Sequence, residues 1–208
     1  MEINNVCSFG SLCHTAQILK TNNFKLCSYP FDWIFTSPTI INHCLIDRFN
    51  IFLDNSYYVN IKNRWNNNQC GHSVYHPDMF NHRDPRKNND HEYYKRCVIR
   101  FNTLIESTNN KLFIMLIPNL ESDNIYDCVD IINLNKTLKT ITTNYIFLVI
   151  LHYKSTKQSH NLTINNNIHY LDLHTLSASN GVEFINKSDN EYINMILHNI
   201  YKFNLINC

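Results

Sequence analysis

The chain has 208 residues, of which 44% are hydrophobic and 12% aromatic, and its formal net charge at pH 7 is +1. This length and composition are typical of one globular domain rather than of a disordered segment. A net charge near zero argues against a general nucleic-acid binder, because such proteins carry a basic surface. No apolar run approaches the roughly 20 residues that span a bilayer.

The N-terminus lacks the basic and apolar regions of a signal peptide. We therefore expect a cytoplasmic protein that binds neither nucleic acid nor membrane. We find no internal repeat and no linker, which indicates a single domain over residues 1–208. Because the chain ends directly after a predicted helix, we keep open that it is one domain of a longer protein.

The first segment of interest is an apolar run at residues 4–9 that breaks at Gly10 and Ser11 and is followed by Cys13. It predicts a strand, a tight turn and a helix at 14–20. Glycine permits a positive φ in such a turn. A cysteine at a helix N-terminus has a lowered thiol pKa, and the order strand, turn, nucleophile, helix is that of a nucleophile elbow. The alternative is an ordinary turn with a buried cysteine.

The next segment places Asp32 and Trp33 inside an apolar run. The pair could offer a carboxylate and a stacking face to a sugar or nucleotide, or it could be a packed turn in which the aspartate accepts from a backbone amide. Ser37 and Pro38 then predict the start of a helix that reaches Phe52.

Residues 57–90 are polar, rich in Asn and His, and without periodicity, which predicts a long functional loop region. His82 and Asp84 within it are candidates for a general base and the carboxylate that orients it. Alternatively, histidines used this freely would belong to an ordinary polar loop. A zinc site is a further alternative, built from Cys70, His72, His76 and His82. Their spacing matches no standard zinc pattern, so we expect no metal.

The rest of the chain alternates predicted helices with near-continuous apolar strands. Helices are predicted at 92–107, 124–140 and 189–205, the last capped by Ser188, and strands at 112–117, 145–151 and 168–173. This order predicts an α/β domain with a mostly parallel sheet and helices on both faces, a three-layer Rossmann-like fold.

Polar residues follow the predicted strands where each one ends. In open parallel sheets, ligands bind at the carboxyl ends of the strands. Cys13, Asn119 and His152 follow three of these strands, so we expect Asn119 and His152 to help bind a substrate or cofactor there. The chain has no GxGxxG, P-loop or GxSxG motif, which disfavours cofactors held by glycine-rich loops.

Four motifs in the first half of the chain occur in the order that is found in a family described as papain-like cysteine peptidases. They are Ser8-Phe9-Gly10-Ser11-Leu12-Cys13, Ser28-Tyr29-Pro30-Phe31-Asp32-Trp33-Ile34 with Ser37-Pro38, Phe80-Asn81-His82-Arg83-Asp84, and Lys95-Arg96 with Arg100-Phe101. The chain therefore resembles this family. Leu12 replaces the family's Asn, which weakens an oxyanion role at that position.

The expected fold differs from that of papain, in which the cysteine begins a long helix and the histidine lies on an antiparallel barrel. The chain also resembles coenzyme A-binding enzymes of polysaccharide biosynthesis and the sugar N-acetyltransferase domain of mimivirus-like giant viruses. That resemblance implies acetyl-CoA-dependent N-acetylation of a nucleotide-linked amino sugar in glycan biosynthesis, with a possible fusion to a glycosyltransferase domain. The alternative is a papain-like cysteine peptidase or other thiol hydrolase. A glycan-binding module without catalysis is a third class.

Both enzyme classes use acyl transfer at a carbonyl. We expect Cys13 to be the nucleophile or the thiol aligned with the acyl group, His82 the base, and Asp84 the group that orients it. The amides of the turn at Gly10 and Ser11 and that of Cys13 would stabilise an oxyanion. Asp32 and Trp33 would hold the sugar.

Overall fold

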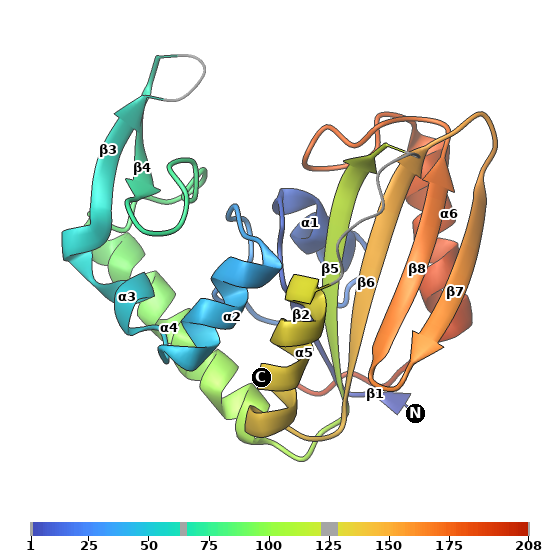
Figure 1. Ribbon diagram of the computed structural model, residues 1–208, viewed down its shortest axis with the longest axis horizontal. Helices are drawn as coiled ribbons and strands as arrows, with labels where there is room; N and C mark the ends of the chain where they lie inside the picture. Colours follow the sequence, from blue (N-terminus) through green and yellow to red (C-terminus); the bar gives the residue numbers. More distant parts are fainter. Residues whose placement is uncertain (1, 63–65, 122–128, 208) are drawn as a thin grey trace.

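The computed structural model describes residues 2–62, 66–121 and 129–207, and its centre is a twisted sheet (Figure 1). In the described residues the strand order is β2-β5-β6-β8-β7. The strands are β2 (Asn5–Ser8), β5 (Lys111–Leu120), β6 (Tyr145–Lys154), β7 (Ser159–Asn165) and β8 (Ile168–Thr175). β2, β5, β6 and β8 are parallel, and β7 pairs antiparallel with β8 at the edge. The predicted, mostly parallel α/β sheet is confirmed.

The side chains of β5 show why these strands are apolar throughout. Leu112 and Ile114 belong to the hydrophobic cluster on one face of the sheet, whereas Phe113 and Met115 belong to the cluster on the other face. Since successive side chains of a strand point to opposite faces, burial of both faces requires an uninterrupted apolar run.

Helices cover both faces, which gives three layers (Figure 1). The cluster around Phe113 includes buried residues of α2 (Pro38–Ile46), α4 (Asn88–Glu106) and α5 (Val129–Ile141). The opposite cluster includes buried residues of α1 (Cys13–Thr21) and α6 (Lys187–Ile200). The three-layer prediction is therefore confirmed. Along the described sheet the parallel strands follow chain order without the reversal of a Rossmann sheet.

The second helix is shorter than predicted. Ser37 caps it as expected, because its side chain accepts from the amide of Ile40 at 3.2 Å. The helix ends at Ile46 because Arg48 and Phe49 have φ values of 53° and 61°, outside the right-handed helical region. A short helix, α3 (Asn50–Leu53), follows.

Residues 57–90 are not one long loop. A turn of 3-10 helix, η1 (Asn55–Tyr57), leads into an antiparallel hairpin of β3 (Tyr58–Lys62) and β4 (Asn68–His72). The hairpin is stable because its inner side chains pack on aromatic rings, as Tyr58 does on Phe80 with ring centroids 5.5 Å apart. The described segment between β4 and α4 contains no regular element.

The C-terminal helix also differs in its ends. α6 begins at Lys187 with Asn186 as N-cap, so Ser188 lies inside the helix, and it ends at Ile200. The chain then forms β9 (Lys202–Phe203), which pairs in parallel with β1 (Glu2–Ile3). Of the helix predicted at 124–140, residues 124–128 lie outside the described part.

No helix in the part of the chain that the structure describes is both long enough and apolar enough to cross a membrane.

Candidate active site

The turn after β2 has two consecutive residues in the left-handed region of the backbone. Gly10 and Ser11 have φ values of 68° and 67°. A Cβ on Gly10 would lie 2.3 Å from Thr36 Oγ1 and 3.2 Å from the carbonyl oxygen of Phe31. Glycine is therefore required at position 10 for both its conformation and its lack of a side chain.

Hydroxyl groups fasten this turn to its neighbours. Thr36 Oγ1 donates to the Phe9 carbonyl at 3.0 Å and accepts from the Ser11 amide at 3.1 Å. Ser11 Oγ donates to the carbonyl of Leu116 on β5 at 2.5 Å. These bonds determine where α1 begins, and therefore where its first residue, Cys13, lies.

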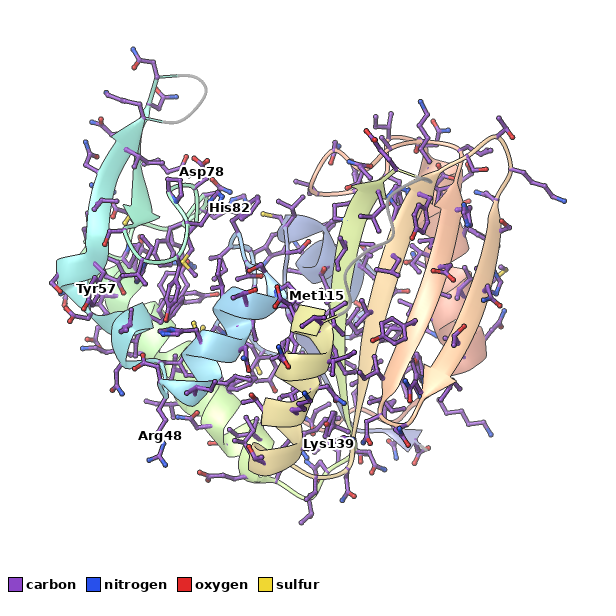
Figure 2. The ribbon with its side chains drawn as sticks, in the orientation of Figure 1. Arg48, Tyr57, Asp78, His82, Met115 and Lys139 are labelled. Carbon is purple, nitrogen blue, oxygen red and sulfur yellow. The ribbon has the colours of Figure 1, made fainter. Side chains whose placement is uncertain are left out.

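Cys13 and His82 lie in contact. Cys13 Sγ is 3.2 Å from His82 Nε2. The thiol comes from the start of α1 and the imidazole from the segment after β4, which Figure 2 shows with Asp78 and His82 on the side that faces α1. The Trp33 ring meets the imidazole edge-on, with centroids 5.9 Å apart and an interplanar angle of 80°. The structure thus brings together the two residues that we predicted as nucleophile and base.

The thiol is less acidic than its position at a helix N-terminus predicts. Cys13 is buried, with 7% of its surface exposed, and burial raises the pKa of its thiol, opposed by the cysteine's own backbone amide. A raised pKa favours the neutral thiol over the thiolate.

The pair opens into a cavity of about 600 Å³, which we call the thiol cavity. Its walls include Leu12, Cys13, Phe35, His82, Asn119 and Val182. A volume of this size accommodates a small organic substrate. Asn119 thus lines the site as predicted.

One wall of the thiol cavity comes from a loop that the sequence analysis missed. Asn119 holds it from both sides: its Nδ2 donates to the Ser179 carbonyl at 2.9 Å, and its Oδ1 accepts from the Ser179 amide at 2.8 Å. Gly181, one of only three glycines in the chain, lies in this loop and was the signal that could have found it.

Asp84 does not orient His82. Its carboxylate accepts from Arg86 Nε and Nη2, both at 2.8 Å, and this pairing lowers the pKa of the aspartate. The short sequence separation between His82 and Asp84 would allow contact, but the carboxylate forms its ion pair with Arg86 instead.

His152 is a buried structural residue rather than a ligand-binding one. Its Nδ1 accepts from the Asn119 amide at 3.0 Å, and its Nε2 bonds Thr175 Oγ1 at 2.7 Å. Since Thr175 Oγ1 donates to the Ser177 carbonyl at 2.7 Å, Nε2 carries the proton and the ring is neutral. Burial lowers the pKa of His152 to about 4. His152 supports the turn at Asn119 from behind.

Asp32 and Trp33 do not line the thiol cavity, whose walls include Cys13 and His82. Both line a second cavity of about 500 Å³, which His82 also lines. Asp32 is 3% exposed, and its Oδ2 accepts from the Tyr29 amide at 2.9 Å and pairs with Lys25. The packed-turn alternative is therefore correct in part, because the aspartate does accept from a backbone amide.

Two of the amides expected as oxyanion donors are engaged by other groups. The Ser11 amide donates to Thr36 Oγ1 at 3.1 Å, and the Gly10 amide donates to Ser8 Oγ at 3.0 Å. The remaining expected donor, the Cys13 amide, lies in the first turn of α1, which has no side-chain cap.

His72 and Cys70, two of the residues considered as zinc ligands, make structural contacts. His72 Nε2 donates to the Ile51 carbonyl at 3.1 Å, and the backbone of the buried Cys70 pairs with that of Phe80 in antiparallel orientation. Among residues 2–62, 66–121 and 129–207, no group of three or more His, Cys, Asp or Glu is placed to hold a metal ion.

The fold and site define a three-layer α/β protein with a cysteine–histidine pair at the carboxyl end of a parallel strand. The model of a family described as "putative papain-like cysteine peptidase" matches residues 4–155, and the chain belongs to this family. The match includes both Cys13 and His82. A search of curated proteins found no match to the chain, and a search of solved structures also found none.

Proposed function

We propose that this protein is a thiol-dependent acyl hydrolase in which Cys13 is the nucleophile and His82 is the general base. The observation that carries the proposal is the 3.2 Å contact between Cys13 Sγ and His82 Nε2 at the wall of the thiol cavity. A nucleophile within hydrogen-bond reach of a base, beside a cavity for substrate, is the minimal set for this chemistry. Membership of the peptidase-like family supports the same class.

The reaction begins with the protonated Cys13 thiol in contact with His82. His82 Nε2 removes the thiol proton as sulfur attacks the substrate carbonyl, so that an S–C bond forms and negative charge moves onto oxygen, near the first-turn amides of α1. When this tetrahedral intermediate collapses, the bond to the leaving group breaks, and the leaving group takes the proton from His82. Water then gives its proton to His82 and attacks the thioester. The C–S bond breaks, sulfur recovers the proton, and the acid is released.

A cysteine that serves only packing needs neither a cavity nor an adjacent imidazole. The free, buried Cys44 lies inside α2 in the hydrophobic core, away from the thiol cavity. Cys13, by contrast, lines a cavity together with an exposed imidazole. This contrast favours an enzyme over a binding module without catalysis.

Acetyl-CoA-dependent transfer to an amino sugar stays a prediction from resemblance. It would use the same pair, with acetyl-CoA as acyl donor and an amine in place of water. A thermal shift with coenzyme A tests it, because a ligand that binds the native state raises the unfolding temperature.

The proposed function is tested by acylation of the thiol with p-nitrophenyl acetate, followed by mass spectrometry of the cysteine-containing peptides, and by cleavage of a peptide library. We expect acetyl on Cys13 and a burst of nitrophenol. Cys13→Ala should abolish both, and His82→Ala should lower kcat/KM by about 10²–10⁴. Cys44→Ala is the matched control and should retain the burst. Equal burst kinetics in Cys13→Ala and the wild type would refute the proposal.

A further inference from the structure

His82 lacks the third group that usually holds a general base in place. Its Nε2 contacts Cys13, and Asp84 is paired with Arg86. Within residues 2–62, 66–121 and 129–207, no group forms a hydrogen bond with His82 Nδ1. Because the imidazole is also exposed, its rotamers would interchange rapidly unless another contact restrained them. The pair with the thiol therefore needs a different support.

The ring of Trp33 supplies a contact of this kind. Its centroid lies 5.9 Å from that of the imidazole, and the two ring planes meet at 80°. Aromatic rings in this edge-to-face arrangement attract each other beyond the burial of their surfaces. The indole therefore disfavours rotamers that would move the imidazole away from it.

The backbone of Trp33 is unusual for so large a residue. Its φ is 62°, in the left-handed region, where a bulky side chain costs free energy. Phe31 and Ile34 on either side of it are fully buried, and Asp32 Oδ2 accepts from the Tyr29 amide at 2.9 Å. A strained conformation persists only where its surroundings fix it, and strained residues gather at functional sites. The anchored neighbours therefore fix the direction of the Trp33 side chain.

Backbone hydrogen bonds join the segment that contains Trp33 to both halves of the pair. The Phe35 amide donates to the carbonyl of Met79, three residues before the histidine, at 3.0 Å. The Thr36 amide donates to the Ser11 carbonyl, in the turn before the nucleophile, at 3.3 Å. The indole, the imidazole and the thiol therefore belong to one connected framework, although they come from three separate segments of the chain.

We infer that Trp33 is a positioning residue that holds the His82 imidazole against Cys13, the task that a carboxylate performs in other nucleophile–base pairs. The inference rests on the proposed function. It assigns Trp33 to the base, whereas the sequence indicated a stacking face for a sugar or nucleotide. A stacking face would act on the substrate whether or not His82 is present, and this difference can be measured.

The test is a double-mutant cycle between Trp33 and His82. The rate constant for acetylation of Cys13 by p-nitrophenyl acetate is measured, by the nitrophenol burst and by mass spectrometry of the peptide, in the wild type, Trp33→Leu, His82→Ala and the double variant. We expect Trp33→Leu to lower it about tenfold, the upper value for one aromatic pair. In the His82→Ala background the same substitution should change it less than about twofold, because residues that act as one unit are not additive.

Two further variants and a control accompany the cycle. Trp33→Phe retains a ring and should recover most of the rate. Trp33→Gly, with the same loss expected, is used if Trp33→Leu does not fold, since glycine adopts a positive φ without strain. Tyr192→Leu is the matched control, because the Tyr192 ring on α6 meets His160 edge-on with centroids 5.7 Å apart. Its loss should leave the rate within about twofold of the wild type.

The outcomes separate the two proposals. Equal rates in Trp33→Leu, Trp33→Gly and the wild type would overturn the role of Trp33 and leave the hydrolase. A loss that persists undiminished in the His82→Ala background would do the same, because Trp33 would then act on the substrate or on the fold. Absence of acetyl on Cys13 in the wild type overturns the proposed function, and this inference with it.

Discussion

Cys13 Sγ and His82 Nε2 lie 3.2 Å apart although 69 positions separate them in the chain. Burial raises the pKa of this thiol, so the thiolate is a minor species at neutral pH. We expect alkylation of Cys13 by iodoacetamide to keep accelerating above about pH 8.5, the ordinary pKa of a cysteine. Peptide mapping by mass spectrometry measures the rate, with the buried Cys44 as internal reference. A plateau already reached below about pH 7 would mean a preformed thiolate–imidazolium pair instead.

Replacing Gly10 should damage the turn that positions the nucleophile. In Gly10→Ala the new Cβ meets Thr36 Oγ1 at 2.3 Å on a backbone with φ of 68°. We expect a loss of about 2–4 kcal/mol in the free energy of unfolding, from the clash and the left-handed backbone together.

Gly181→Ala is the control for Gly10→Ala. Gly181 also has a positive φ, 95°, so alanine there is strained as well. Its added Cβ, however, would be nearest to Leu12 Cδ1, at 3.7 Å. It should cost only about 1–2 kcal/mol in a urea titration. Equal losses in the two variants would show that steric contact with Thr36 is unimportant.

Removal of the Asp84 charge should leave catalysis nearly intact. Because the carboxylate pairs with Arg86, Asp84→Asn should change the kcat/KM for p-nitrophenyl acetate by less than about fivefold, whereas the loss of a carboxylate that orients a catalytic histidine costs about 10⁴. Steady-state kinetics at pH 7.5 decide the matter. A loss of a thousandfold or more would restore Asp84 to the catalytic group.

The anchor between Asn119 and Ser179 should control the wall of the thiol cavity. Asn119→Asp keeps the acceptor for the Ser179 amide but replaces the donor to its carbonyl with a second acceptor. We expect amide hydrogen exchange in residues 176–182 to accelerate roughly tenfold, the effect of about one lost hydrogen bond. Exchange in α5, on the other face of the sheet, should not change. Unaltered exchange in the loop would mean that other contacts hold it.

The fold should lose stability in mild acid. Burial, with the nearby His152 as a smaller cause, lowers the pKa of His14 to about 3, and burial lowers that of His152 to about 4. The unfolded chain, in which the histidine pKa is about 6.5, therefore binds more protons than the native one as pH falls below that value. Each histidine should cost about 2 kcal/mol between pH 7 and pH 5.

Urea titrations at pH 7 and pH 5 measure this loss. In His152→Gln, which cannot titrate, the difference between the two pH values should shrink by about the share of that histidine, roughly 2 kcal/mol. An unchanged difference would show that His152 is accessible to protons in the native state.

Local patterns in the sequence were sufficient for much of the fold. The apolar run at 112–117 predicts β5 because a strand buried on both faces has no place for polar residues. Ser37 and Pro38 predict the start of α2 because capping is a matter of adjacent residues. Gly10 followed by Cys13 marks the nucleophile turn for the same reason.

The errors fell where distant contacts override local preference. β3 and β4 were predicted as loop because β4 is short and polar, whereas β3 has an alternation that was overlooked: Val59 and Ile61 are half-buried, and Asn60 and Lys62 between and after them are exposed. α2 ends earlier than predicted because Arg48 and Phe49 have left-handed backbone conformations. After this bend, Phe52 is buried in the hydrophobic core.

By itself the sequence determined the class of the domain and the position of Cys13, since both depend on residues that are neighbours in the chain. Only the tertiary structure decided which partner each side chain has. It placed His82 against the thiol, gave Asp84 to Arg86, buried His152 behind Asn119, and put Asp32 in a second cavity. The physical reason is that hydrogen bonds, ion pairs and burial depend on distances across the folded chain, which spacing along it does not set.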